Sequence, residues 1–196
     1  MLSERQEEQR NLRKKSILDG ALKVFKIHGI EKTTMDEIAT ESGFGKATLY
    51  YYFASKDEVF IAIMEEGWKQ LWEGIESKIV EELSPRKKFM DIIKEMANIV
   101  RSNRILYGFL FTAPNHIQDE SKQIWKTYQE RLYAILKSII EEGIKKKEFI
   151  NLDPGMLMKA IGGLFHGLLI ENKDDLDKKE FELMLNNFLR PNNAAN

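Results

Sequence analysis

The chain has 196 residues, and 43% of them are hydrophobic, which is enough to bury a core in one domain or in two small ones. It contains no cysteine, so disulfides, thiolate nucleophiles and cysteine metal sites are excluded. The formal net charge is −1, and residues 1–56 carry 10 basic and 8 acidic side chains, so nucleic acid would have to be bound by a few well-placed cations rather than by a general basic coat.

No membrane segment is expected. Residues 1–15 lack the apolar core of a signal peptide, and the longest apolar run, residues 160–170, is too short to span a bilayer. The sequence therefore predicts a cytoplasmic protein without a membrane partner.

The start of the chain, residues 1–13, is charged on all sides, which is typical of a solvated helix start. Four cations could instead reach a phosphate or the minor groove, namely Arg10, Arg13, Lys14 and Lys15. From Lys15 to His28, apolar residues recur at spacings of three and four, and Gly29 then ends the predicted helix. This helix has one apolar face with which to cover the short helices that follow.

Residues 33–57 have the pattern of a helix-turn-helix. Thr34 and Glu37 predict a capping box at the start of one short helix, and Gly43 suits its left-handed end. A second short helix, KATLYYYF, is predicted to start at Lys46.

The remainder of the chain has helical periodicity and no strand pattern. The expected helices run from Lys56 to about Leu83, from Ser84-Pro85 to a break near Ser102-Asn103, through the apolar run that ends at Pro114, from about His116 to Lys147, from Asp153-Pro154 to about Glu171, and from about Leu176 to Leu189. We therefore predict an all-α protein of about nine helices.

The segment TTMDEIATESGFGKATLYYYFASKDEVF resembles the N-terminal domain of TetR-type (tetracycline-repressor-like) bacterial transcriptional regulators. The paired threonines, the IA pair, the glycine and the TLY, YF and SK pairs stand at the family's spacings, and the match covers roughly residues 14–61. Gly45 and Ala47 depart from the usual pattern, which leaves the base preference open. The resemblance implies a helix-turn-helix domain over residues 1–55 and a larger helical ligand-binding and dimerisation domain over 56–190. The polar tail, 191–196, is expected to be disordered.

The second short helix carries residues suited to DNA. Lys46 can bind a phosphate or reach guanine in the major groove, Thr48 can donate to a phosphate, and the Ala47 methyl can contact thymine. The resemblance implies that Leu49 and Phe53 face the core, that Tyr50, Tyr51 and Tyr52 lie on the DNA side, and that Thr34 and Lys56 hold the DNA backbone on either flank. The alternative is that the aromatic cluster only packs the domain.

One helix-turn-helix contacts only a few base pairs, so operator affinity in the usual range requires two copies held about one DNA turn apart. The last two helices are the expected dimer surface, because Gly162, Gly163 and Gly167 permit close approach of another helix. The expected interface residues are Leu157, Ile161, Leu164, Leu168, Phe181, Leu185 and Phe188. The alternative is ordinary packing within one chain.

The resemblance also implies a ligand pocket enclosed by the middle helices. The expected lining residues are Trp68, Trp72, Phe89, Met96, Tyr107, Phe111, Trp125, Tyr128, Phe165 and His166. A few polar tips in an apolar cavity suit a flat aromatic, drug-like or acyl ligand. At least half of these residues are expected to be core only, and His166 has ordinary core packing as its alternative.

We predict a ligand-responsive transcriptional regulator, a repressor that binds a palindromic operator in double-stranded DNA as a homodimer and is released by a small apolar or aromatic effector. The effector is expected to act through the long helix that starts at Lys56. No cofactor, metal or enzymatic activity is expected, because the three histidines are dispersed and no GxSxG, P-loop or HExxH motif is present. The alternative is a helical protein-interaction module without sequence-specific DNA binding.

Overall fold

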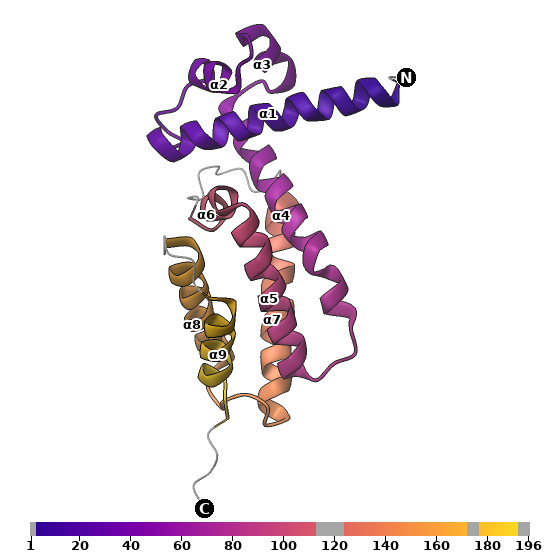
Figure 1. The fold of residues 1–196 in the computed structure, drawn as a ribbon, viewed down its shortest axis with the longest axis vertical. Helices are drawn as coiled ribbons and strands as arrows, with labels where there is room; N and C mark the ends of the chain where they lie inside the picture. The colour runs from indigo at the N-terminus through magenta and orange to yellow at the C-terminus, as the bar shows by residue number, and fades with distance from the viewer. Residues whose placement is uncertain (1–2, 113–123, 172–176, 192–196) are drawn as a thin grey trace, which may run out of the picture. The chain divides into compact units, whose positions relative to one another are not determined.

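The computed structural model describes residues 3–112, 124–171 and 177–191, and over these residues the chain is helical without a strand (Figure 1). Its elements are α1 (Glu4–His28), α2 (Met35–Ser42), α3 (Lys46–Tyr52), α4 (Lys56–Val80), α5 (Pro85–Ser102), α6 (Arg104–Thr112), α7 (Ile124–Lys145), α8 (Pro154–His166), the π-helical turn η2 (Gly167–Glu171) and α9 (Lys178–Phe188). The predicted all-α class is confirmed. None of these helices is both long and apolar enough to cross a membrane.

The chain divides into two compact units. The first unit contains α1, α2, α3 and the start of α4 up to Gly67. The second contains Trp68–Phe111 and the described residues from Ile124 onward. Helix α4 therefore belongs to both units.

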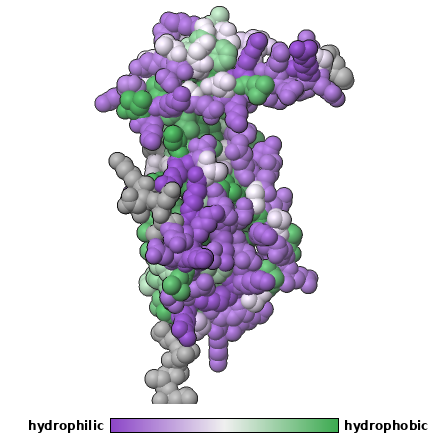
Figure 2. Space-filling view, in the orientation of Figure 1, coloured by the Kyte–Doolittle hydropathy of each residue, from purple (hydrophilic) through white to green (hydrophobic). Residues whose placement is uncertain are grey.

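Helix α1 begins well before its apolar stripe. Ser3 and Gln6 form a capping box that starts the helix at Glu4, and residues 3–16 are all exposed. The surface of this segment is hydrophilic in the space-filling view (Figure 2). The expected solvated start is thus a regular, exposed helix, and contact of its cations with DNA stays a prediction. Gly29, with φ of 76°, ends the helix as predicted.

In the first unit, α1 packs closely on α2 at a glycine. A methyl group on Gly20 would lie 2.9 Å from the N, Cα and Cβ atoms of Ser42, which is too close for any side chain. The core of this unit is apolar and includes Ile17, Ala21, Phe25, Ile38, Leu49, Phe53, Val59, Phe60 and Ile63. Burial of Leu49 and Phe53 confirms the face of α3 that the resemblance implied.

In the second unit, α5 and α7 run side by side (Figure 1). Phe89 of α5 is fully buried and packs edge to face on Phe149, with ring centroids 5.7 Å apart. The predicted starts at Ser84-Pro85 and Asp153-Pro154 are confirmed, because both N-cap side chains accept a hydrogen bond from the first helical turn.

Three predicted boundaries differ or are untested. The helix expected to continue to Glu171 changes to a π turn at Gly167. The expected helix start near His116 and the expected tail beyond Pro191 lie outside the described residues.

Arg86 joins three parts of the second unit. Its guanidinium donates to the carbonyls of Glu148 at 2.9 Å, of Leu189 at 3.2 Å, and of Asn186. The Arg86 backbone N–H also donates to the Glu148 carboxylate at 2.8 Å. The start of α5, the loop after α7 and the end of α9 are therefore held by one side chain.

Replacing Arg86 by alanine is expected to lower the free energy of unfolding by about 2 kcal/mol, because three carbonyls lose a charged donor. Urea unfolding followed by circular dichroism measures the change. Lys87→Ala, at the exposed neighbouring position, is the matched control and should shift stability by less than about 0.5 kcal/mol. Equal losses for the two variants would show that the Arg86 hydrogen bonds contribute nothing.

Candidate functional site

The helix-turn-helix is held together by its caps. The Thr34 hydroxyl accepts from the Glu37 N–H at 3.3 Å, and the Glu37 carboxylate accepts from the Thr34 N–H at 2.8 Å. The Thr34 N–H, and the Thr34 hydroxyl that donates to the same carboxylate at 2.8 Å, lower the pKa of the Glu37 carboxyl. Gly43, at φ 74° and ψ 19°, takes the left-handed conformation that ends α2. The predicted capping box and turn are confirmed.

Helix α3 presents a short outer face. Lys46, Ala47, Tyr50 and Tyr51 are exposed, and the two tyrosines are 53% and 74% accessible. Thr48 and Tyr52 are half-buried. A helix that exposes two phenols and one ammonium group offers several donors to an external acceptor.

Lys46 already has an acidic partner. Its ammonium forms an ion pair with Asp36 of α2, and both side chains are largely exposed. An exposed pair of this kind contributes little to stability, so a phosphate can displace the carboxylate at small cost.

Lys56 has internal partners. Its ammonium donates to the carbonyls of Ile30, Glu31 and Thr33 at 2.9, 2.7 and 3.3 Å. These carbonyls lie in the turn between α1 and α2, so the first residue of α4 holds the loop that leads into the helix-turn-helix. The sequence reasoning assigned Lys56 to the DNA backbone and did not foresee this role.

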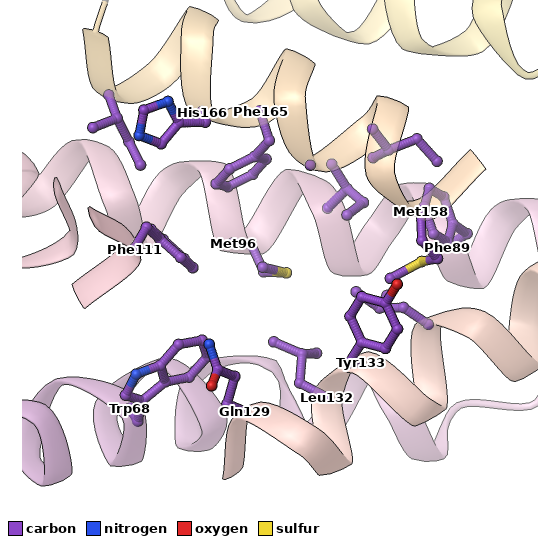
Figure 3. Close-up of a pocket in the computed structure, with 15 residues that line it drawn as sticks. Trp68, Phe89, Met96, Phe111, Gln129, Leu132, Tyr133, Met158, Phe165 and His166 are labelled. Atoms are coloured by element: carbon purple, nitrogen blue, oxygen red, sulfur yellow. The ribbon is translucent and has the colours of Figure 1, made fainter. Parts of the chain in front are cut away.

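The second unit contains a cavity of about 320 Å³ (Figure 3). Its lining residues are Trp68, Phe89, Ile93, Met96, Phe111, Gln129, Leu132, Tyr133, Leu136, Met158, Ile161, Gly162, Phe165, His166 and Ile170. Figure 3 shows Trp68, Phe111 and His166 toward one end of the cavity and Phe89, Tyr133 and Met158 toward the other. The volume is at the lower end of the range of ligand pockets.

Part of the cavity wall is aromatic. The Trp68 and Phe111 rings meet edge to face with centroids 5.6 Å apart, and the Phe111 and Phe165 rings do so at 6.1 Å. Such contacts fix the orientation of large rings and leave a rigid apolar surface for a ligand.

His166 ends α8 at the cavity. Its Nδ1 lies 3.5 Å from Oε1 of Glu171. The two residues are five positions apart, which the π turn between them brings together.

Six of the ten residues expected at a ligand pocket line this cavity, namely Trp68, Phe89, Met96, Phe111, Phe165 and His166. The other four are not among its lining residues. Trp72 packs near Tyr128, with centroids 6.3 Å apart, and lies under the Arg131 guanidinium at 4.3 Å. Tyr107 and Trp125 are buried core residues.

Comparison with known proteins shows the family. The profile described as "Bacterial regulatory proteins, tetR family" matches residues 17–63, and the profile described as "Tetracyclin repressor-like, C-terminal domain" matches residues 82–169. The chain belongs to the TetR family. It is thus a transcriptional regulator of the TetR family, with a DNA-binding helix-turn-helix at its N-terminal end.

Individual relatives of this TetR-family protein are distant. The uncharacterised HTH-type transcriptional regulator YfiR of Bacillus subtilis is 28% identical over 173 residues, which are 79% of this chain and 82% of YfiR. The fatty acid metabolism regulator protein of Bacillus subtilis is 23% identical over 135 residues, 67% of this chain and 68% of that protein. The crystal structure of AibR in complex with isovaleryl coenzyme A and operator DNA has a TM-score of 0.76 at 17% identity, covering 90% of this chain and 97% of AibR. At such identity the likeness to AibR concerns the fold.

The residues expected at the dimer surface of this TetR-family regulator separate into two groups. Leu157, Ile161, Phe181 and Leu185 are at most 5% exposed within the single chain, and Ile161 lines the cavity. Leu164 and Leu168 are half-buried, and Phe188 is 38% exposed. The first group thus packs within its own chain.

Exposed apolar side chains on α8 and α9 form the surface that we propose for a second copy. Met156 is 55% exposed and Leu183 is 63% exposed. A Cβ atom on Gly163, seven residues after Met156 on α8, would meet no atom of the described residues within 4 Å. The sequence analysis did not name Met156 and Leu183, because it selected the buried stripe of each helix.

Sequence reasoning also missed the polar residues at the cavity. Gln129 and Tyr133 lie one helical turn apart on α7 and are exposed, so they lie where the cavity opens to solvent. The sequence signal for these two residues was their position three residues before Leu132 and Leu136. Side chains next to the apolar stripe of a helix lie at the edge of the core or cavity that the stripe faces.

Proposed function

We propose that this TetR-family regulator is a repressor that binds a palindromic operator as a homodimer and is released by a small apolar or aromatic effector in the cavity of its second unit. The observation that carries the proposal is that two residues of helix α4 have different partners. This one helix bears Lys56, which holds the loop before α2, and Trp68, which lines the cavity. A ligand that displaces Trp68 can therefore act on the helix that anchors the DNA-binding motif.

The DNA contacts are proposed for the outer face of the motif. Lys46, Ala47, Tyr50 and Tyr51 are accessible to a major groove, and Thr48 and Tyr52 border them. Thr34 and Lys56 are proposed at the flanks, although the Lys56 ammonium must share its donors with the loop carbonyls. Such a regulator works where the chromosome is, in the cytoplasm.

The release step requires a difference in effector affinity between two states of the protein. An effector that binds better when α4 is displaced weakens operator binding, and the operator weakens effector binding by the same factor. A coupling of about 1–3 kcal/mol gives roughly a 5- to 150-fold change. AibR, which was crystallised with both isovaleryl coenzyme A and operator DNA, has the same fold, so this fold can hold an acyl ligand and an operator.

Replacing Lys46 by alanine is the test of the proposal. The operator is first selected from random DNA with purified protein, and its affinity is then measured by fluorescence anisotropy at several salt concentrations. Loss of one contact of about 1 kcal/mol or more per copy, made twice in a dimer, should weaken binding by about 30- to 100-fold. The slope of log affinity against log salt should fall by about 2, because one phosphate contact is lost in each half-site.

The controls for this test use the same chemistry. Lys69→Ala removes another exposed, ion-paired lysine outside the first unit and should leave affinity unchanged. Asp36→Asn frees Lys46 from its carboxylate and should increase affinity. Equal affinity for selected and random DNA would favour the protein-interaction module instead. Operator affinity that stays constant while an aromatic compound saturates the cavity would refute the effector role.

A further inference from the structure

The indole N–H of Trp68 is buried, and none of the described residues accepts a hydrogen bond from it. Trp68 is 3% exposed and lines the cavity. A buried donor without an acceptor is destabilising, and such groups in native proteins call for an explanation. An acceptor atom on a molecule bound in the cavity would satisfy this donor.

Trp125 gives an internal comparison. It is also buried, at 5% exposure, and its Nε1 likewise finds no acceptor in the part of the chain that the structure describes. Trp125 does not line the cavity, so no ligand there can reach it. The two tryptophans therefore share their burial and their unpaired donor, and differ in access to the cavity.

Among the described residues that line the cavity there is no lysine, arginine, aspartate or glutamate that could neutralise a charged ligand. Among the described residues that line it, the polar side chains are Trp68, Gln129, Tyr133 and His166. When His166 is protonated, its Nδ1 already faces the Glu171 carboxylate at 3.5 Å. An ionised carboxylate, phosphate or ammonium group in this cavity would lose its hydration without gaining a counter-charge.

The volume of the cavity also limits how much of a ligand can be enclosed, since the cavity opens to solvent beside Gln129 and Tyr133. At roughly 30 Å³ for each water-sized group, a volume of about 320 Å³ holds roughly ten non-hydrogen atoms. A coenzyme A thioester is far larger and carries several phosphate charges, so only its acyl end would fit.

We propose that the cavity binds an uncharged, mainly apolar molecule of roughly ten non-hydrogen atoms that presents a carbonyl or ether oxygen to the Trp68 indole N–H. This inference rests on the proposed function, since it names the chemical class of the effector. Trp68 determines specificity because ligands with an acceptor oxygen bind more tightly. The apolar wall of Phe111 and Phe165 favours binding of a flat or branched apolar body.

Three probes with the same number of non-hydrogen atoms test the inference. Acetophenone carries a carbonyl acceptor, cumene replaces that carbonyl group by an apolar branch, and benzoate carries a charge. Dissociation constants are measured by titration calorimetry with the full-length protein. Resonances of the indole N–H groups, assigned with Trp→Phe variants, report the hydrogen bond directly.

Trp68→Phe should lower the preference for acetophenone over cumene by about fivefold to tenfold, the contribution of one buried hydrogen bond. Using the ratio of the two dissociation constants removes the difference in hydrophobicity between the probes. Trp125→Phe is the matched control and should leave this ratio unchanged. In the wild-type protein, acetophenone should shift the Trp68 N–H resonance downfield, cumene should not, and benzoate should bind at least tenfold more weakly than acetophenone.

The outcomes separate the two proposals. If neither neutral probe perturbs the residues that line the cavity, the proposed effector site itself is wrong. If both neutral probes bind but the ratio is unchanged in Trp68→Phe, or if benzoate binds as tightly as acetophenone, the acceptor inference is overturned while the cavity remains a ligand site. If Trp68→Phe does not fold, the wild-type N–H shift decides between the same two results.

Discussion

Gly20→Val is expected to lower the free energy of unfolding of the first unit by about 3 kcal/mol, at the upper end of the cost of overpacking. The first atom of any side chain at this position would lie 2.9 Å from the N, Cα and Cβ atoms of Ser42. Two of these atoms are backbone of α2, which cannot move away as a flexible side chain could. Helix α2 must therefore shift or separate from α1, and the recognition helix α3, which follows it, loses its support.

Hydrogen exchange over α2 and α3 measures the loss locally, and operator binding measures its consequence. Asp19→Val is the matched control, because it places the same β-branched residue at the adjacent exposed position of α1. The control should change stability by about 0.5 kcal/mol or less. Similar losses for Gly20→Val and Asp19→Val would show that the contact with Ser42 does not account for the effect.

The contact at Gly20 shows which parts of the fold the sequence could predict. Caps and turns depend on neighbours three to five residues away, so Thr34 with Glu37 and the left-handed Gly43 were predictable. Gly20 meets Ser42 across two helices. Nothing in the local sequence of α1 distinguishes a glycine that permits such contact from one that is merely tolerated.

The same limit applies to the cavity. Trp68 and Trp72 lie one turn apart on α4 and were predicted together, but only Trp68 lines the cavity. Trp72 lies under Arg131 of α7, which the sequence alone could not place beside it. Helical periodicity predicts that a residue is buried but does not identify the helix or chain that it packs against. The buried residues Leu157 and Leu185 could therefore be assigned to a dimer surface from the sequence.

Residue chemistry has a similar limit. A lysine beside a DNA-binding motif can donate to a DNA phosphate or to backbone carbonyls, and the residue type does not decide between them. In the structure Lys56 donates to three carbonyls. The π turn after His166 could not be predicted from composition. Its backbone hydrogen bonds span one residue more than those of an α-helix, while the sequence keeps a helical pattern.

Leu183→Glu is expected to convert the protein to monomers and to weaken operator binding by more than about 100-fold, because specific affinity depends on two linked half-site contacts. Leu183 is 63% exposed on α9, so the substitution leaves the core of the chain intact. A glutamate buried between two copies would lose its hydration at both symmetric positions of the interface. Sedimentation velocity gives the association state, and anisotropy gives the operator affinity.

Val80→Glu is the control, since Val80 is 75% exposed at the end of α4 and is not part of the proposed surface. It should remain a dimer with unchanged operator affinity, whereas Leu183→Glu should bind the operator with a steeper dependence on protein concentration. The steeper dependence follows because two monomers must then meet on the DNA, and each half-site gains only its own contact energy. A Leu183→Glu protein that stays dimeric and binds the operator normally would place the dimer surface elsewhere. Monomers that nevertheless keep full operator affinity would instead remove the requirement for a homodimer.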